Sequence, residues 1–258
     1  MPDQSHYADK KSFFDRMLTI YGRKPVLETL QDTSLECHAL HLAESNREAG
    51  IVADIRQCAQ KRGIPIKIHS REALARISKN GKQDQGVALD VLCPSFQQLT
   101  HYLSEPAEKP RRLLALDGIN NPQNLGMIIR SAAAGEIDGI ILAQKGTAAL
   151  GPLVIKASAG TLYRAPLLLH PALPEALKLC QDKGSQVCML EAGAPISLFH
   201  HRAGAFCVYV LGNETDGVSA QVKALADTQL SIPMRNGVES LNVAVTASLI
   251  AYGPHLER

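Results

Sequence analysis

The chain has 258 residues, of which 45% are hydrophobic, and a formal net charge of +2. It can bury a sizeable core, and its length allows one large domain or, as we expect, two smaller ones. The six cysteines show neither a Cys-x-x-Cys pair nor a histidine at zinc-like spacing, which argues against a metal site and indicates reduced thiols in a cytoplasmic protein. A membrane-spanning helix would need a run of about 18 apolar residues, and the sequence has no such run.

The first part of the chain has three predicted regions. Residues 1–16 are polar and charged, which predicts a flexible tail. Residues 17–93 predict a small α/β domain, because apolar runs alternate there with amphipathic stretches. Three prolines and a charged run predict a linker at residues 94–111.

Residues 112–258 predict a second domain, in which short apolar runs alternate with helical patterns. This alternation indicates a mainly parallel sheet covered by helices. The expected strands include residues 113–116, 140–142, 187–190 and 206–211. Ligands of open α/β sheets gather beyond the carboxyl ends of the strands, so the polar residues at those ends are candidates for a site.

The first polar block, LALDGINNPQNLGMIIRSA, occupies residues 114–132 and runs from a strand through a turn into a helix. Its asparagines and proline fit ordinary turn and helix-start chemistry. Arg130 lies off the apolar stripe of the helix, and a solvated surface arginine is the simplest interpretation of it. The pattern explains the turn and leaves a role for Arg130 open.

The second block, VLGNETDGVS, occupies residues 210–219 and places Glu214 between two glycines. Gly212 and Gly217 suggest a phosphate cradle, but Val218 stands where the nucleotide-binding G-x-x-x-x-G-K-[ST] pattern has lysine. A nucleotide hydrolase is therefore disfavoured. The glycines can equally serve backbone conformation, and Glu214 can be a solvated carboxylate.

The third block, LSIPMRNGVESLNVAVTASLIAYG, occupies residues 230–253 and ends in a stretch that is apolar on nearly every side. Such a helix should be buried. Ser240 is a good candidate for its N-cap. Asn242 would then lie inside the apolar run, where its amide needs hydrogen-bond partners that its neighbours cannot supply.

In this order the three blocks resemble the three motifs of the SpoU (TrmH) family of RNA 2′-O-ribose methyltransferases, within the SPOUT superfamily, over residues 112–252. YGRKPVLETL at 21–30 and QGVALDV at 85–91 resemble parts of that family's substrate-binding domain. The resemblance implies an α/β fold with a SPOUT-type parallel sheet and a C-terminal trefoil knot, preceded by a small ribosomal-protein-like α/β domain that binds the RNA substrate.

The resemblance also implies that S-adenosyl-L-methionine binds in the knot, held largely by backbone groups. It implies a homodimer whose active site is completed across the interface, with ribosomal or transfer RNA as the substrate. The cofactor-binding positions that it implies are Leu211, Gly212, Ile232, Met234 and Leu241.

The family's polar active-site positions match Asn124, Arg130, Glu214, Ser240 and Asn242. A ribose hydroxyl is a weak nucleophile, and alignment of the reactants can remove roughly 7–11 kcal/mol of the barrier. Arg130 matches the family's proposed base. Arginine is almost always protonated, so electrostatic stabilisation of the forming alkoxide is the less demanding alternative.

Three residues depart from the family's common pattern. Ala244 stands where a serine is common, Asn121 where an aspartate is frequent, and Asp84 where ribosomal-RNA members often have histidine. None of these departures removes a proposed catalytic group. They leave the subfamily and the target nucleotide open.

Residues 61–82 form a basic stretch with seven lysines and arginines against one acidic residue, Glu72. A solvated face and an RNA-binding surface are both compatible with it, and its place in the presumed substrate-binding domain favours RNA. The candidates are Arg62, Lys67, Arg71, Arg76, Lys79 and Lys82.

The sequence thus predicts a ribose methyltransferase acting on ribosomal or transfer RNA, with ribosomal RNA slightly preferred. The alternative is a non-catalytic RNA-binding or ribosome-assembly protein on the same scaffold, because a fold does not guarantee activity.

Overall fold

The computed structural model describes residues 13–256. Residues 1–12, most of the predicted tail, lie outside the described residues. The described part of the chain divides into two compact units, residues 13–94 with 150–152 and residues 95–149 with 153–256. None of the described helices is both long enough and apolar enough to cross a membrane.

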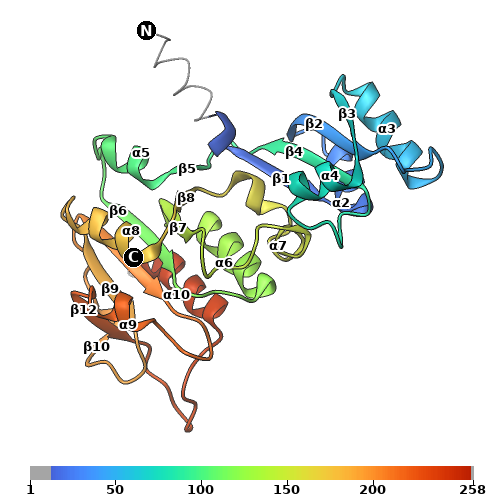
Figure 1. The fold of residues 1–258 in the computed structure, drawn as a ribbon. Helices are drawn as coiled ribbons and strands as arrows, with labels where there is room; N and C mark the ends of the chain where they lie inside the picture. Colours follow the sequence, from blue (N-terminus) through green and yellow to red (C-terminus); the bar gives the residue numbers. More distant parts are fainter. Residues whose placement is uncertain (1–12, 257–258) are drawn as a thin grey trace. The chain divides into compact units, whose positions relative to one another are not determined.

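The first unit is a four-stranded sheet of order β1-β4-β2-β3 (Figure 1). Strand β4 pairs antiparallel with β1 and β2, and β3 pairs parallel with β2. Its elements are β1 (Met17–Tyr21), α2 (Arg23–Gln31), β2 (Glu36–Ala43), α3 (Ile51–Lys61), β3 (Ile66–His69), α4 (Arg71–Ser78) and β4 (Val87–Leu92). The predicted small α/β arrangement is present.

The second unit is an eight-stranded sheet of order β10-β12-β9-β11-β6-β7-β8-β5, in which every neighbouring pair is parallel. The prediction of a mainly parallel sheet with helices between the strands is confirmed. The first elements are β5 (Gln97–Gln98), α5 (Leu99–Ser104), β6 (Arg111–Leu116), α6 (Pro122–Ala134), β7 (Gly139–Ala143), α7 (Pro152–Ala157), η1 (Thr161–Arg164) and β8 (Leu167–His170). They are followed by α8 (Leu173–Gln181), β9 (Gln186–Leu190), β10 (Ile196–Ser197), η2 (Leu198–His200), β11 (Phe206–Leu211), α9 (Ala220–Lys223), β12 (Thr228–Ser231) and α10 (Val243–Leu256).

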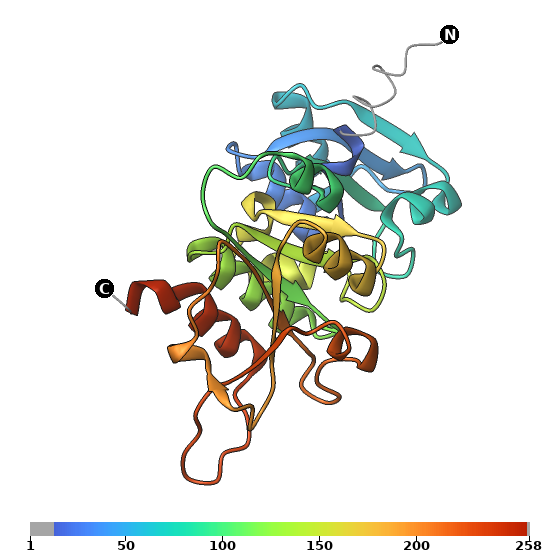
Figure 2. The same cartoon turned by 90° about the vertical axis from the view of Figure 1, so that its left-hand side faces the viewer.

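Helices cover both faces of this sheet. On one face, apolar residues of α5, α8 and α9 pack with alternate residues of the central strands in one buried cluster. On the other face α6 lies beside α10, as both ribbon views show (Figures 1 and 2). Because successive strand residues point to opposite faces, Val208 and Val210 join the first cluster while Cys207 and Tyr209 point to the face of α10.

The segment expected to be a linker is partly structured. Residues 97–104 form the edge strand β5 and the short helix α5, and both belong to the second unit. Leu99 and Leu103 of α5 are buried in the sheet's core. The sequence signal was weak because the strand has two residues, both glutamine, and the helix only six.

Candidate active site

The carboxyl ends of β6 and β11 lie next to each other, since Leu116 and Leu211 are direct partners in the sheet. The segments that follow are tied together by hydrogen bonds. The backbone N–H of Asp117 donates to the carbonyl of Leu211 at 2.8 Å, and the N–H of Ser219 donates to Oδ2 of Asp117 at 2.7 Å. The first and second polar blocks therefore form one surface at this edge of the sheet.

Asn124 connects all three blocks. It is buried in the first turn of α6, which begins with Asn121 as N-cap and Pro122 at the first helical position. Its Nδ2 donates a hydrogen bond to Oε1 of Glu214, from the second block. Its Oδ1 accepts one from Nδ2 of Asn242, from the third block, at 3.2 Å. Three of the five predicted polar residues thus form a continuous hydrogen-bonded chain.

The start of α10 differs from the sequence expectation. The helix begins at Val243, and the side-chain Oδ1 of Asn242 accepts from the N–H of Ala244 at 2.8 Å. Asn242 is therefore the N-cap, a role in which asparagine is as good as serine. Its side chain is exposed, with Oδ1 and Nδ2 each in one hydrogen bond, whereas the prediction placed it inside the helix and gave the cap to Ser240.

Ser240 and Arg130 stand outside the hydrogen-bonded chain. Ser240 lies in the exposed segment before α10 and lines a pocket. Arg130 is exposed on α6, and its guanidinium makes no hydrogen bond or ion pair with the residues that the structure describes. It shares an outward stripe of the helix with Met127.

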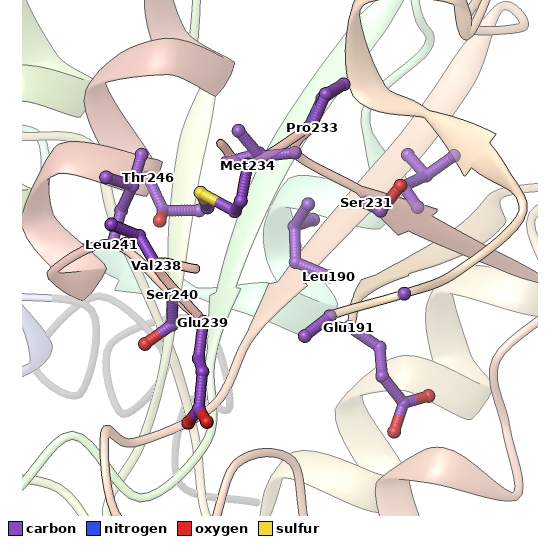
Figure 3. Close-up of a pocket in the computed structure, with 14 residues that line it drawn as sticks. Leu190, Glu191, Ser231, Pro233, Met234, Val238, Glu239, Ser240, Leu241 and Thr246 are labelled. Atoms are coloured by element: carbon purple, nitrogen blue, oxygen red, sulfur yellow. The ribbon is translucent and has the colours of Figure 1, made fainter. Parts of the chain in front are cut away.

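A pocket of about 430 Å³ opens between the ends of β9 and β12 and the start of α10. Figure 3 shows Val238, Ser240, Leu241 and Thr246 along one side, with Leu190, Glu191 and Ser231 along the other. Three predicted cofactor residues, Ile232, Met234 and Leu241, line this pocket. Leu211 and Gly212 are not among its lining residues, and Leu211 is buried in its strand.

The residues at the end of β9 and directly after it were not predicted as part of the site. Leu190, Glu191 and Gly193 line the pocket because β9 lies beside β12, so that the ends of both strands open into the same space. The rule that ligands bind beyond strand ends, applied to the apolar run 187–190, could have found them.

The loop of the second block is a tight turn. A Cβ at Gly212 would overlap the backbone of Gly217 and Val218, so only glycine fits there. Asn213 Oδ1 accepts from the N–H groups of Thr215 and Asp216 at 2.8 and 2.7 Å. Those N–H groups are therefore engaged within the loop, and this arrangement does not resemble a phosphate cradle.

The basic stretch of the first unit divides into two kinds of residue. Arg62 is half-buried, and its guanidinium donates to the carbonyls of Leu30, Asp32 and Leu35. Arg62 therefore fastens the turn between α2 and β2, and its donors face protein rather than solvent. The remaining candidates are exposed on and around β3 and α4, namely Lys67, Arg71, Arg76, Lys79 and Lys82.

Fold and site together define an α/β protein that gathers polar side chains and a small-molecule pocket at the carboxyl edge of a parallel sheet. Residues 111–252 match the SpoU rRNA Methylase family, and residues 19–95 match the domain described as RNA 2′-O ribose methyltransferase substrate binding. The chain belongs to the SpoU methylase family and is an RNA methyltransferase of that family.

Relatives and solved structures agree with this assignment. The chain is 34% identical over 233 residues, 90% of its length and 74% of the relative's, to an uncharacterized tRNA/rRNA methyltransferase of Mycolicibacterium vanbaalenii. A similar protein of Mycobacterium marinum is 34% identical over 242 residues, 92% of this chain and 76% of the relative.

Two solved structures share the fold. The SpoU methyltransferase AviRb of Streptomyces viridochromogenes, in complex with AdoMet, has a TM-score of 0.63 at 19% identity, covering 100% of this chain and 94% of its own. An AdoMet-bound rRNA methyltransferase of Sinorhizobium meliloti has a TM-score of 0.63 at 20% identity, covering 98% and 91%.

Proposed function

We propose that the protein transfers the methyl group of S-adenosyl-L-methionine to the ribose 2′-hydroxyl of an RNA nucleotide. The observation that carries this proposal is the hydrogen-bonded chain from Asn242 through Asn124 to Glu214, which starts at the helix that also borders the pocket. The family's substrate-binding domain and the name of the matched methylase family favour ribosomal RNA, with transfer RNA as the other substrate class.

The pocket fits S-adenosyl-L-methionine in size and chemistry. Its volume of about 430 Å³ falls in the range of about 300–1,000 Å³ common for small-molecule sites. Apolar side chains such as Leu190 and Met234 suit an adenine ring, and the carboxylate of Glu191 suits hydroxyl or ammonium groups. Ile232, Met234 and Leu241 would hold the cofactor, which when bound supplies an electrophilic methyl group. Leu211 and Gly212 would shape the neighbouring loop that presents Glu214.

The polar chain would position the reacting hydroxyl. Glu214 is exposed, and Asn124 donates a hydrogen bond to one of its oxygens, which leaves the other free to accept a hydrogen bond from the substrate ribose. Asn242 holds Asn124 in turn, so the orientation of Glu214 depends on the start of α10. Such preorganisation is a large source of rate acceleration in reactions that depend on alignment.

Arg130 would stabilise the negative charge that develops on the ribose oxygen. To remove the hydroxyl proton, Arg130 would first have to lose its own proton, which arginine almost never does in proteins. Electrostatic stabilisation needs only the protonated guanidinium. The exposed position of Arg130 on the outward stripe of α6, outside the hydrogen-bonded chain, suits a contribution to the site of a second subunit. Ser240, at the mouth of the pocket, would order the loop around the cofactor.

We propose that two copies of the chain pair through α6 and α10. Met127 on α6 is 41% exposed, and Val245 and Tyr252 on α10 are 47% and 40% exposed. The two helices pack side by side and are joined by hydrogen bonds from Ser248 to Ser131 and from Tyr252 to Ala134, so their exposed apolar residues would be covered together by a second copy. A helix that is apolar on nearly every side needs a partner for its outer face.

The dimer is tested by sedimentation of the wild type and of Val245→Glu. The variant should be monomeric and inactive, while a wild-type monomer would contradict the pairing.

The RNA would be bound by the exposed basic residues around β3 and α4. All six cysteines are free, which suits the reducing cytoplasm.

The chemistry is tested with labelled S-adenosyl-L-methionine and total RNA, followed by alkaline hydrolysis. Methylation of a ribose blocks cleavage at that nucleotide, so the label should appear in alkali-resistant dinucleotides. Label in base-modified mononucleotides would contradict ribose methylation. Binding of S-adenosylhomocysteine without any transfer to RNA would instead support the non-catalytic alternative. Glu214→Gln is the matched inactive control, because it keeps the shape of the side chain.

A further inference from the structure

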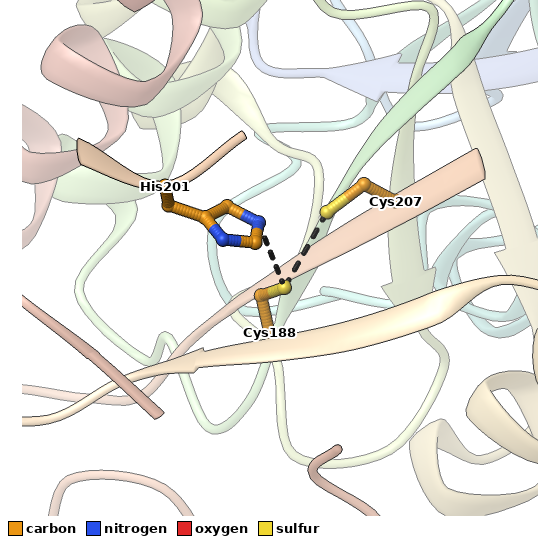
Figure 4. A group of neighbouring side chains, drawn as sticks. All are labelled: Cys188, His201 and Cys207. Atoms are coloured by element: carbon orange, nitrogen blue, oxygen red, sulfur yellow. Dashed lines mark hydrogen bonds between the residues drawn. The ribbon is translucent and has the colours of Figure 1, made fainter. Parts of the chain in front are cut away.

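Two cysteines and a histidine meet on the face of the sheet that α10 covers. Cys188 lies on β9, Cys207 on the neighbouring strand β11, and His201 directly after η2 (Figure 4). Sγ of Cys188 lies 3.5 Å from Nε2 of His201 and 3.5 Å from Sγ of Cys207. The three potential ligand atoms all lie within 4.8 Å of one another.

The two distances from Sγ of Cys188 are close to the edges of a tetrahedral metal site. With Zn–S bonds of about 2.3 Å and Zn–N bonds of about 2.0–2.1 Å, two sulfur ligands lie about 3.8 Å apart, and sulfur and nitrogen about 3.5 Å apart. Sulfur and imidazole together form a ligand set that zinc prefers. Both cysteines are buried and His201 is half-buried, so the three atoms are held by packed elements.

A disulfide fits the backbone less well. Cys188 is the direct partner of Tyr209 in the sheet, which places Cys207 two residues out of register. Strands about 4.8 Å apart and a stagger of two residues, about 6.6 Å, separate the two Cα atoms by about 8 Å. Bridged cysteines have Cα atoms at most about 7 Å apart. Metal coordination needs no such approach of the backbones.

His201, one member of the cluster, lines a cavity that could hold a fourth ligand. This cavity of about 470 Å³ is lined by Arg112 and Tyr209 of the sheet, by His201 and its neighbours after η2, and by residues of α10. Nε of Arg112 is buried and, within the described residues, has no hydrogen-bond partner. A water or anion bound to a metal ion would give this N–H an acceptor.

We propose that Cys188, His201 and Cys207 bind a zinc ion with three protein ligands and a fourth position open to this cavity. On binding, the metal replaces the two thiol protons, which pass to the buffer, and the two thiolates balance its charge. The ion joins β9, β11 and the segment between η2 and β11. This site is separate from the proposed methyl-transfer site and does not depend on it.

The test uses the full chain, reduced and stripped of metal, titrated with cobalt(II) as a spectroscopic probe. We expect one equivalent of cobalt to give the visible bands of a tetrahedral site together with a thiolate-to-cobalt charge-transfer band, both abolished by added zinc. Zinc should also raise the Tm of the wild-type protein.

The matched variants separate the cluster from other thiols. His201→Ala and Cys207→Ala should lose the charge-transfer band or weaken it strongly, and they should lose the zinc-dependent rise in Tm. Cys180→Ala, which removes an equally buried cysteine of α8 outside the cluster, should keep both. Circular dichroism of each variant establishes that it is folded before titration.

Three outcomes would overturn the proposal. The first is a reduced, folded wild-type protein that shows no thiolate-to-cobalt band with cobalt in excess. The second is a band that persists unchanged in both His201→Ala and Cys207→Ala. The third is a protein that, after reduction and brief exposure to air, loses two hydrogen atoms in mass with a Cys188–Cys207 peptide link, which would identify a disulfide pair instead.

Discussion

The two units differ in where their hydrogen-bonded polar side chains lie. In the first unit interior side chains gather around Asp90 and His41 in one hydrogen-bonded network. Nε2 of His41 donates to Asp90 at 2.9 Å, Nδ1 of His41 lies 2.9 Å from Nε2 of His69, and Thr19 donates to Asp90 at 2.6 Å. In the second unit the polar groups converge at one edge of the sheet and leave Glu214 exposed.

This difference assigns RNA binding to the first unit and methyl transfer to the second in the proposed function. The first unit carries exposed lysines and arginines on its surface, around β3 and α4. Their positive charges can attract the phosphates of RNA over several ångströms. The second unit uses the residue that caps α10 to hold a candidate active-site chain. Substitutions in the second unit should therefore change turnover, and surface substitutions in the first should change RNA affinity.

The largest effect is expected for Arg130→Ala. Loss of a charged group that stabilises a developing oxyanion lowers kcat by about 100-fold or more. Binding of S-adenosylhomocysteine, measured by calorimetry, should stay unchanged, because Arg130 does not line the pocket. Full activity of the variant would remove Arg130 from the mechanism.

Gly212→Ala should destabilise the second unit. The new Cβ would overlap backbone atoms, which cannot move aside as a flexible side chain can. Overpacking of this kind costs about 1–3 kcal/mol of unfolding free energy. Gly204→Ala is the matched control, since nothing lies within 4 Å of the position that its added methyl group would take. Equal urea midpoints for the two variants would contradict the close approach.

Two substitutions of Asn242 separate its role as N-cap of α10 from its hydrogen bond to Asn124. Asn242→Ala removes both the N-cap and the hydrogen bond to Asn124, and should cost about 1 kcal/mol of stability. Asn242→Ser restores a cap but is too short to replace the amide donor. We expect Asn242→Ser to have nearly wild-type stability and reduced kcat, as measured by urea unfolding and single-turnover methylation. Wild-type kcat in the serine variant would show that the chain to Asn124 is dispensable.

The double variant Lys79→Ala, Lys82→Ala should weaken RNA binding several-fold and leave kcat at saturating RNA unchanged. Each lost phosphate contact should reduce the slope of log K against log salt by about 0.7–0.9. Lys178→Ala, an exposed lysine of the second unit, serves as the control. A salt slope that does not change would mean that these two lysines face solvent in the complex.

The smallest effect is expected for Asp90→Asn, which should lower the free energy of unfolding by an amount that depends on pH. Burial tends to raise the pKa of Asp90, but hydrogen bonds from His41 and Thr19 outweigh it and hold the pKa below its usual value of 3.8. The folded state thus favours the carboxylate, so its contribution to stability is present above the unfolded pKa and is lost as pH falls through the folded one. The stability difference between wild type and variant should shrink in acid; a difference independent of pH would contradict this.

The sequence predicted features that depend on local pattern. The strand ends and the turn before α6 follow from residues close together in the chain, whereas Gly212 and Gly217 were compatible with either a phosphate cradle or a backbone turn. Arg62 and the Cys188–His201–Cys207 cluster could not be predicted in this way. Their roles depend on which segments pair in the sheet, and the ligand spacing of the cluster follows no motif.

The start of α10 shows a different limit. Ser240 and Asn242 are equally good N-caps, so local preference cannot choose between them. The choice falls on Asn242 because its amide also reaches Asn124, which is 118 residues away.

The order of strands in the large sheet has a consequence for synthesis. β12 pairs with β9 on one side and β10 on the other, so it fills an interior position although it is the last strand of the sheet in the chain. A nascent chain on the ribosome therefore exposes one unpaired edge of β9 until β12 has emerged. At about 5–20 residues per second this interval lasts on the order of seconds, long enough for a chaperone or a neighbouring nascent chain to reach the open edge.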